Sequence, residues 1–255
     1  MDISDKQWEV LEKPLTSIFE TSETRGRPRQ DARAVLNGIL WICRTGAPWA
    51  DLPGRYPPYQ TCHRYHKQWC KSGSWDSVLH ALACDLRDRG KIDITECFID
   101  GTFASAKKGG LVFGPTKKGK GTKIMAVTDA AGIPLAVRAF SASTHEVKLA
   151  DRTIRSCAVK PKRVIADRAY DSDKLRRTLK KRGIRLVCPH RSNRKRQVQQ
   201  DGRELRRYKR RWKVERLFAW LFNSRRTFVR YEYHAELFLG MVQLACVMIV
   251  FKNYF

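Results

Sequence analysis

The 255-residue sequence is short of acidic residues, and this shortage is its most informative absence. It contains 25 Asp and Glu against 51 Lys and Arg, which gives a formal net charge of +26 at pH 7. Unbalanced charge of this size destabilises a compact chain by self-repulsion unless a polyanion neutralises it. Nucleic acid is the natural partner, because binding to phosphates releases condensed counterions. A ribosomal-type protein and a merely very soluble surface are the alternatives to a protein that acts on DNA.

A signal sequence and a long hydrophobic run are also missing. The chain opens with the acidic residues Asp2 and Asp5 and has no basic stretch followed by an apolar one, so we expect a cytoplasmic protein. The longest apolar run, 237–251, contains Gly240 and Gln243 and is too short to cross a bilayer comfortably. We therefore expect a buried helix there and no membrane partner.

No two of the eight cysteines form a Cys-x2-Cys pair. Scattered thiols are typical of small buried residues in a reducing compartment. Cys62, His66 and Cys70 follow one another at helical spacing, with His63 nearby. Three such side chains could bind zinc, although a structural zinc site normally has four ligands drawn from two segments. Packing in a helix is the first interpretation of these residues, and zinc binding is the alternative.

The composition divides the chain near residue 90. Before that point, apolar residues at helical spacing predict four helices, at 5–20, 31–45, 59–71 and 75–89. Asp31 is placed to cap the second helix, and the third carries Arg64 and Lys67. These helices predict a helix-turn-helix-like domain, residues 1–90, whose third helix enters the major groove of DNA. A helical bundle with a solvated basic face is the alternative.

From residue 92 the pattern changes to strands that alternate with helices. Apolar runs between turn residues predict five strands, at 97–99, 123–127, 135–140, 163–166 and 185–188. We expect the accompanying helices at 145–157, 172–182, 203–226 and 234–252. Three strands followed by alternating helices and strands give an α/β fold, a mixed five-stranded sheet with flanking helices in the ribonuclease-H-like order. We assign it to residues 91–255.

Two carboxylates occupy the ends of predicted strands. Asp100 follows the first strand and Asp167 ends the fourth. These strands are neighbours in the predicted fold, so the two side chains should stand side by side, and a divalent cation would remove their repulsion. Taken singly, Asp100-Gly101 is an ordinary turn dipeptide and Asp167-Arg168 is an ordinary ion pair.

A third acid, Glu215, lies on a helix face with apolar neighbours. Phe218 and Phe222 follow it at helical spacing, and a carboxylate in such surroundings must be paired or coordinated. Tyr208, Arg211 and Glu215 form a polar line on this face. A simple Arg211–Glu215 pair would explain two of the three residues. We predict that Asp100, Asp167 and Glu215 are catalytic metal ligands.

Basic residues surround these acids. Fifteen Lys and Arg lie between residues 191 and 230, against three acids, and a second basic, glycine-rich stretch covers 117–123. Such runs usually track phosphates. His145 is expected either to contact a DNA strand or to cap a helix. The residues that we expect to contact DNA are Arg64, Lys67, Lys117, Lys118, Lys120, Lys123, His145, Arg168, Tyr208, Arg211, Arg225 and Arg226.

The order of several motifs resembles the insertion-sequence-five family of bacterial DDE transposases. They are Gly-Ala-Pro-Trp-Ala-Asp-Leu-Pro at 46–53, Phe-Ile-Asp-Gly-Thr at 98–102, Ala-Asp-Arg-Ala-Tyr-Asp-Ser at 166–172 and the stretch 208–221. The resemblance implies a DDE triad of Asp100, Asp167 and Glu215 on a ribonuclease-H-like domain, with Mg²⁺ as cofactor and Mn²⁺ as a substitute. Relatives carry a Tyr-x2-Arg-x3-Glu-x6-Lys signature. Phe222 stands at its lysine position here, so Arg225 or Arg226 would have to substitute.

The activity implied by this resemblance is DNA transposition. The amino-terminal domain would recognise the terminal inverted repeats of the element. The triad would then cut the DNA and join its 3′ ends to target DNA, by in-line displacement at phosphorus with two Mg²⁺ ions. Joining two ends implies a homodimer on double-stranded DNA. The alternatives are a metal-dependent nuclease and a DNA-binding regulator of transposase ancestry without catalytic activity.

Overall fold

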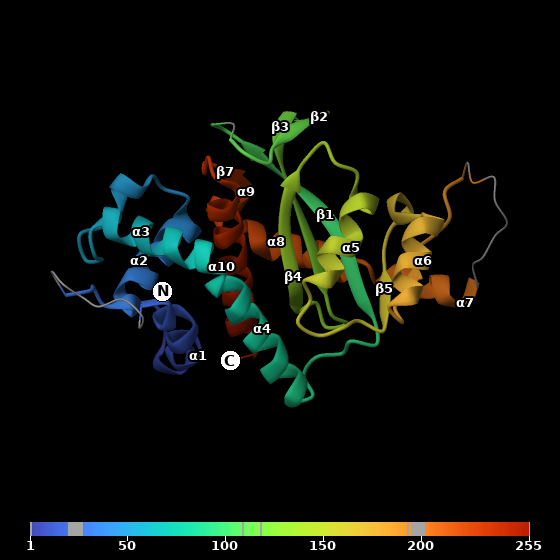
Figure 1. The fold of residues 1–255 in the computed structure, drawn as a ribbon, viewed down its shortest axis with the longest axis horizontal. Coiled ribbons are helices and arrows are strands. Elements are labelled where there is room, and N and C mark those ends of the chain that lie inside the picture. Colours follow the sequence, from blue (N-terminus) through green and yellow to red (C-terminus); the bar gives the residue numbers. More distant parts are fainter. Residues whose placement is uncertain are drawn as a thin grey trace.

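The computed structural model describes residues 2–19, 28–108, 110–117, 119–192, 194 and 202–254. The α-helices are α1 (Asp5–Thr16), α2 (Ala32–Thr45), α3 (Tyr59–Ser72), α4 (Ser74–Asp88), α5 (Glu146–Arg155), α6 (Asp173–Lys181), α7 (Gly202–Leu205), α8 (Trp212–Phe222), α9 (Arg225–Phe228) and α10 (Ala235–Tyr254). Short 3-10 helices are η1 (Ser17–Phe19), η2 (Trp49–Asp51), η3 (Arg168–Tyr170) and η4 (Arg206–Arg210). Helices α1 to α4 gather on one side of a central sheet, and α6 and α7 lie on the other (Figure 1).

The strands are β1 (Cys97–Ala106), β2 (Gly114–Thr116), β3 (Gly119–Thr128), β4 (Pro134–Ser141), β5 (Arg163–Ile165), β6 (Arg185–Val187) and β7 (Val229–Arg230). They form one sheet in the order β2-β3-β1-β5-β6, with β4 beside β3 and β7 beside β1. The β1, β3 and β4 pairings are antiparallel, whereas β5 and β6 join in parallel. This confirms the predicted mixed sheet, to which the short strands β2 and β7 are added.

Strand β1 differs from the prediction, which ended it at Ile99. It continues to Ala106 and pairs with β3 from Phe98–Thr128 to Ser105–Gly121. Hydrogen bonding to β3 holds this segment in the sheet although its apolar pattern has ended, because strand preference depends strongly on context. The prediction that Asp100 ends a strand, and the alternative that Asp100-Gly101 forms a turn, are therefore both wrong.

The helix predicted over 203–226 is also wrong as one element, because it is divided into α7, η4, α8 and α9. Basic residues crowd the stretch 203–211, and like charges at helical spacing destabilise a regular helix. In η4 the chain tightens, and Arg207 and Arg210 both contact the buried carboxylate of Glu96. Arg211, at the junction with α8, turns toward Asp100.

Helix α10 forms the centre of the core. By length and composition the stretch Ala235–Asn253 could cross a membrane, but 72% of it is buried inside the protein. It packs against α2, α3, α4, α8 and β4. This confirms the predicted buried helix. Trp69 of α3, Phe98 of β1 and Phe238 of α10 belong to one continuous core, which crosses the predicted domain boundary near residue 90.

The cysteine and histidine residues of α3 serve packing. His66 is 1% exposed, and its Nε2 lies 3.0 Å from the Leu237 carbonyl oxygen. The Cys70 Sγ contacts the same ring. Among the described residues, the side chains grouped closely enough to hold a metal ion are acids elsewhere in the fold. The alternative of zinc binding by α3 therefore finds no support in this part of the chain.

Candidate active site

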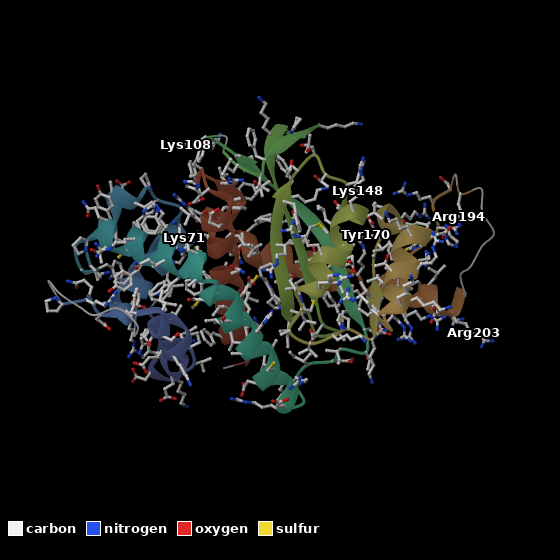
Figure 2. All side chains as sticks on the ribbon, in the orientation of Figure 1. Lys71, Lys108, Lys148, Tyr170, Arg194 and Arg203 are labelled. Carbon is white, nitrogen blue, oxygen red and sulfur yellow. The ribbon has the colours of Figure 1, made fainter. Side chains whose placement is uncertain are left out.

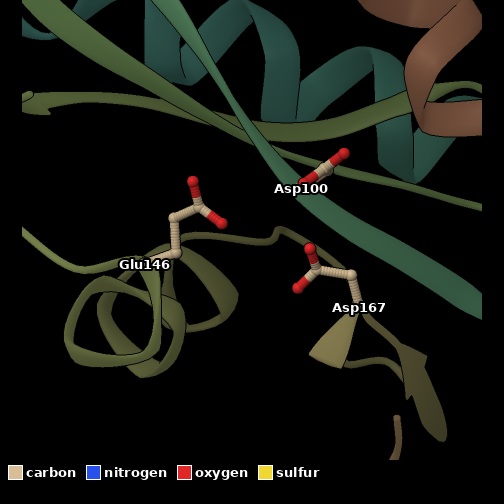
Figure 3. Close-up of side chains that lie close together, drawn as sticks. All are labelled: Asp100, Glu146 and Asp167. Carbon is tan, nitrogen blue, oxygen red and sulfur yellow. The ribbon is translucent and has the colours of Figure 1, made fainter. Parts of the chain in front are cut away.

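The sheet brings Asp100 and Asp167 together. Strands β1 and β5 run in parallel, with Phe98 opposite Ile165. Asp100 and Asp167 each lie two residues beyond this pair. The parallel register therefore places both residues at the same level along two neighbouring strands. Their carboxylates lie close together (Figure 3). The predicted meeting of the two acids is therefore confirmed, although only Asp167 lies outside its strand.

The third acid in this group is Glu146, on the first turn of α5. One carboxylate oxygen from each of Asp100, Glu146 and Asp167 can be chosen so that all three lie within 4.8 Å of one another (Figure 3). Sequence reasoning missed Glu146. The sequence did hold a signal: Glu146 is an acid at the start of a predicted helix, where the amino terminus of a helix favours negative charge. In the structure, this helix start brings the Glu146 carboxylate to the two strand acids.

Gly101 makes room for Glu146 beside Asp100. A Cβ atom at this position would lie 3.1 Å from Glu146 Oε1 and 2.9 Å from Met125 Sδ. Such distances are shorter than normal van der Waals contact, so any side chain at residue 101 would displace Glu146 or Met125. The Asp-Gly dipeptide thus serves the spacing of the acids within a strand.

The three carboxylates repel one another because they carry like charges at short distance. Burial raises the pKa of Asp100 to about 6, while the Arg211 guanidinium and the Gly101 N–H oppose the rise and the nearby Glu146 and Asp167 add to it. A carboxylate that is desolvated and close to like charges favours either a proton or a cation. Carboxylate oxygens are the ligands that hard divalent cations prefer. The group therefore fits a divalent metal ion.

Glu215 reaches this group through an arginine. Arg211 donates from Nη1 to Asp100 Oδ2 at 2.7 Å and from Nη2 to Glu215 Oε1 at 2.6 Å. The Glu215 side chain is 53% exposed, so the apolar enclosure expected for it is not found. The guanidinium also lies 5.8 Å from the centre of the Tyr208 ring, so Tyr208, Arg211 and Glu215 are neighbours, as predicted from their spacing. The catalytic role of Glu215 stays a prediction.

The residues predicted to contact DNA differ in accessibility. Those that are exposed are Arg64, Lys67, Lys117, Lys120, His145, Arg168 and Arg225. Tyr208, Arg211 and Lys123 are half-buried. Arg226 is 6% exposed, and its guanidinium binds Glu232 and the carbonyl oxygens of Gly46 and Ala47 inside the protein. Lys118 lies outside the described residues. The DNA contacts themselves stay predictions.

Two of these residues adjoin the acids directly. His145 occupies the cap position of α5 but makes no capping hydrogen bond with its side chain, which leaves the ring exposed. Lys123 Nζ donates to the Thr144 carbonyl oxygen at 2.8 Å and lies 3.4 Å from Glu146 Oε1. An open groove continues from there, and it is lined by Gly101, Thr102, Phe103, Thr116, Lys117, Lys123, Ala142 and Glu146.

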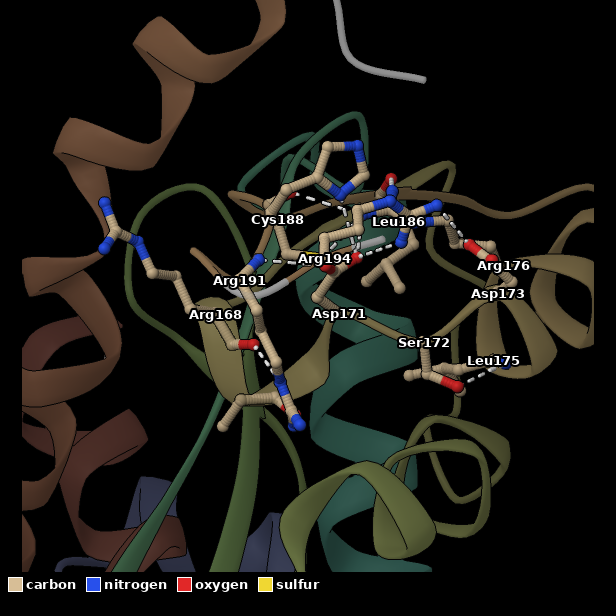
Figure 4. A network of polar contacts seen from close by, with 12 residues as sticks. Arg168, Asp171, Ser172, Asp173, Leu175, Arg176, Leu186, Cys188, Arg191 and Arg194 are labelled. Carbon is tan, nitrogen blue, oxygen red and sulfur yellow. Dashed lines mark hydrogen bonds and ion pairs between the residues drawn. The ribbon is translucent and has the colours of Figure 1, made fainter. Parts of the chain in front are cut away.

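A polar network fixes the loop that carries Asp167. Asp167 Oδ1 accepts from the Ala169 N–H at 2.8 Å and caps η3. Four residues later, the Asp171 carboxylate, 1% exposed, binds Arg176, His190 and Arg194 (Figure 4). Burial alone would raise the pKa of Asp171, but the Arg191 N–H and the His190 and Arg176 side chains outweigh it and lower the pKa to about 2.

Comparison with known proteins agrees with this arrangement of acids. Residues 3–79 match the family model of transposases of the IS4/5 family, and residues 92–249 match that of the transposase DDE domain. The chain belongs to the DDE transposases of the IS4/5 class. The resemblance found in the sequence motifs is confirmed, and the protein is a transposase by family.

Two relatives of this transposase come from other insertion sequences. It is 36% identical over 150 residues to the transposase of insertion sequence element IS402 from Burkholderia cepacia, covering 54% of this chain and 67% of that protein. It is 35% identical over 132 residues to the transposase of element IS6501 from Brucella ovis, covering 50% of this chain and 96% of that protein.

The transposase also resembles a solved structure, the piggyBac transposase synaptic complex with hairpin DNA. The TM-score is 0.54 at 12% sequence identity, and the match covers 96% of this chain and 71% of that chain. At this identity the likeness shows the fold alone. It confirms the ribonuclease-H-like fold, and membership of the DDE family implies that the acid group uses a divalent metal.

Proposed function

We propose that this transposase cuts DNA at the ends of its element and joins the freed 3′ ends to target DNA. The observation that carries the proposal is the juxtaposition of Asp100 and Asp167 across β1 and β5 within a DDE domain. Mg²⁺ is the proposed metal, with Mn²⁺ as a substitute, because the donors are carboxylate oxygens. Bound there, it would supply charge stabilisation to the attacking and leaving oxygens at phosphorus.

The chain's own residues would hold and orient the reacting groups. Asp100 and Asp167 are proposed as the shared metal ligands and Glu215 as the third member of the triad. Lys123, beside Glu146 at the end of the open groove, is placed to neutralise a phosphate of the bound strand. His145 directly precedes Glu146 at the start of α5, and its exposed ring is available to contact the same DNA strand.

We propose double-stranded DNA as the partner, both as element ends and as target. The net charge of +26 supports this, and so does the fold shared with a transposase solved with hairpin DNA. Residues 1–90 are the proposed reader of the inverted repeats, since α3 exposes Arg64 and Lys67. Two element ends call for a homodimer on DNA, and we expect it to act in the bacterial cytoplasm.

The test is a strand-transfer assay with the full-length protein. DNA carrying the inverted repeats that flank the gene, labelled at the 5′ end of the strand to be joined, would be incubated with plasmid target and Mg²⁺. We expect joined products from the parental protein and about 1,000-fold slower joining by Asp167→Asn. Cleavage without joining would instead identify a nuclease, and specific binding without cleavage would identify a regulator; either result would overturn the proposal.

A further inference from the structure

The three clustered acids include one residue for which the DDE triad gives no role. Glu146 comes from a helix, not from the strands that carry Asp100 and Asp167, yet its carboxylate joins theirs within 4.8 Å. Its side chain is 22% exposed, and that of Asp100 is 14% exposed. Lys123, 3.4 Å from Glu146, and Arg211, 2.7 Å from Asp100, offset part of the negative charge of the three acids, and a divalent cation would offset the rest.

A second feature of the same place is the buried hydroxyl of Tyr170. Tyr170 is fully buried, and its hydroxyl lies beside Glu146, the side chain to which it can donate a hydrogen bond. Glu146, Asp100 and Asp167 are the charged groups that act on it. A buried hydroxyl donor at Glu146 helps to hold this carboxylate beside Asp100 and Asp167.

The position of Arg211 explains why Glu215 is not a member of this cluster. Its guanidinium lies between the two carboxylates and binds one oxygen of each, at 2.7 Å for Asp100 and 2.6 Å for Glu215. Arginine forms strong, charge-assisted bonds of the same kind with phosphate oxygens. A DNA phosphate arriving at this surface would therefore compete with both carboxylates for Arg211.

We propose that Glu146 is a ligand of the divalent cation held by Asp100 and Asp167, and that Arg211 withholds Glu215 from this ion until a DNA phosphate engages the guanidinium. The inference rests on the proposed function. It assigns the ligand set to two states of the same site: Asp100, Asp167 and Glu146 without DNA, and a set that gains Glu215 with DNA. The metal site would thereby be completed only on substrate.

Direct metal binding tests this without relying on catalysis. Mn²⁺ binding to the full-length protein would be measured from the paramagnetic resonance signal of the free ion, with and without duplex DNA. Without DNA, we expect Glu146→Gln to weaken binding at least about tenfold and Glu215→Gln to change it less than about twofold. With DNA, Glu215→Gln should also weaken binding. Arg211→Gln should make the protein without DNA sensitive to the loss of Glu215.

The control is Glu236→Gln, which removes an exposed acid from the first turn of another helix, α10, and should leave Mn²⁺ binding unchanged. Thermal unfolding would verify that each variant is folded. Parental Mn²⁺ affinity in Glu146→Gln would overturn the ligand assignment. An equal loss in Glu215→Gln without DNA would overturn the role of Arg211. Strand transfer is assayed separately, so a failure of the proposed function would appear as metal binding of the expected pattern without joined products.

Discussion

Asp167 and Asp171 stand four residues apart on one loop and have opposite surroundings. Asp171 is enclosed by Arg176, His190 and Arg194 (Figure 4). The Arg191 N–H, His190 and Arg176 outweigh the effect of burial and lower its pKa to about 2. Asp167 accepts one capping N–H and otherwise faces two more acids (Figure 3). The first carboxylate is neutralised by the protein itself, and the second is left for something that the protein binds. Asp171 therefore stabilises the loop, whereas the loop positions Asp167 for binding a ligand.

Replacing Asp167 should have the largest effect on activity. Asp167→Asn removes a charged metal ligand, and we expect strand transfer to fall about 1,000-fold, since metal stabilisation of the transition state amounts to several kcal/mol. The melting temperature should not fall, because the asparagine can still cap η3. The measurement is the initial rate of joined product. A variant that joins DNA at the parental rate would remove Asp167 from the site.

Replacing Asp171 should lower the stability of the fold, in contrast to the replacement of Asp167, which should lower activity. Asp171→Asn leaves the surrounding cations without a buried counter-charge, which costs about 3 kcal/mol. For a chain of this size that lowers the melting temperature by roughly 6–12 °C. Differential scanning calorimetry of the metal-free protein measures it. The matched Asp173→Asn variant, which loses one contact to Arg194, should shift the melting temperature much less.

Replacing Asp100 should show how much burial of this carboxylate and repulsion among the three acids destabilise the metal-free fold. Its folded-state pKa of about 6 exceeds its ordinary value of 3.8, so its ionised form destabilises the metal-free fold above that pH. At pH 7.5 we therefore expect Asp100→Asn to raise the melting temperature, by roughly 2–4 °C if about 1 kcal/mol is recovered. Added Mg²⁺ should stabilise the parental protein and not this variant. A lower melting temperature in the metal-free variant would contradict this destabilisation.

The smallest expected effect is the pH dependence of the Asp171 contribution. Its pKa is lowered from 3.8 to about 2 in the folded protein, so its stabilisation is present above pH 4 and is lost as the pH falls toward 2. The difference in melting temperature between parental protein and Asp171→Asn should therefore be constant from pH 7 to 5 and shrink at pH 3. Guanidinium unfolding at each pH provides a second measurement. A difference that persisted unchanged at pH 3 would assign the effect to packing.

Much of the site was legible in the sequence because it depends on strand order. Apolar runs placed Asp100 and Asp167 beside neighbouring strands, and parallel pairing of β1 with β5 then brought them together. Glu146 was missed because it begins a helix, and no periodicity shows where a helix start points. The apolar enclosure expected for Glu215 failed because η4 turns Arg211 between that residue and Asp100.

The amino-acid sequence by itself determined the alternation of strands and helices, the basic surface, the family motifs and the pairing of two strand acids. These follow from local patterns of polarity and charge along the chain. Tertiary structure alone decided that α10 completes one core shared by the helical region and the sheet, that Arg226 is buried, and that Glu146 joins the acids. Those outcomes depend on distances between segments far apart in the chain, which are set when apolar faces pack.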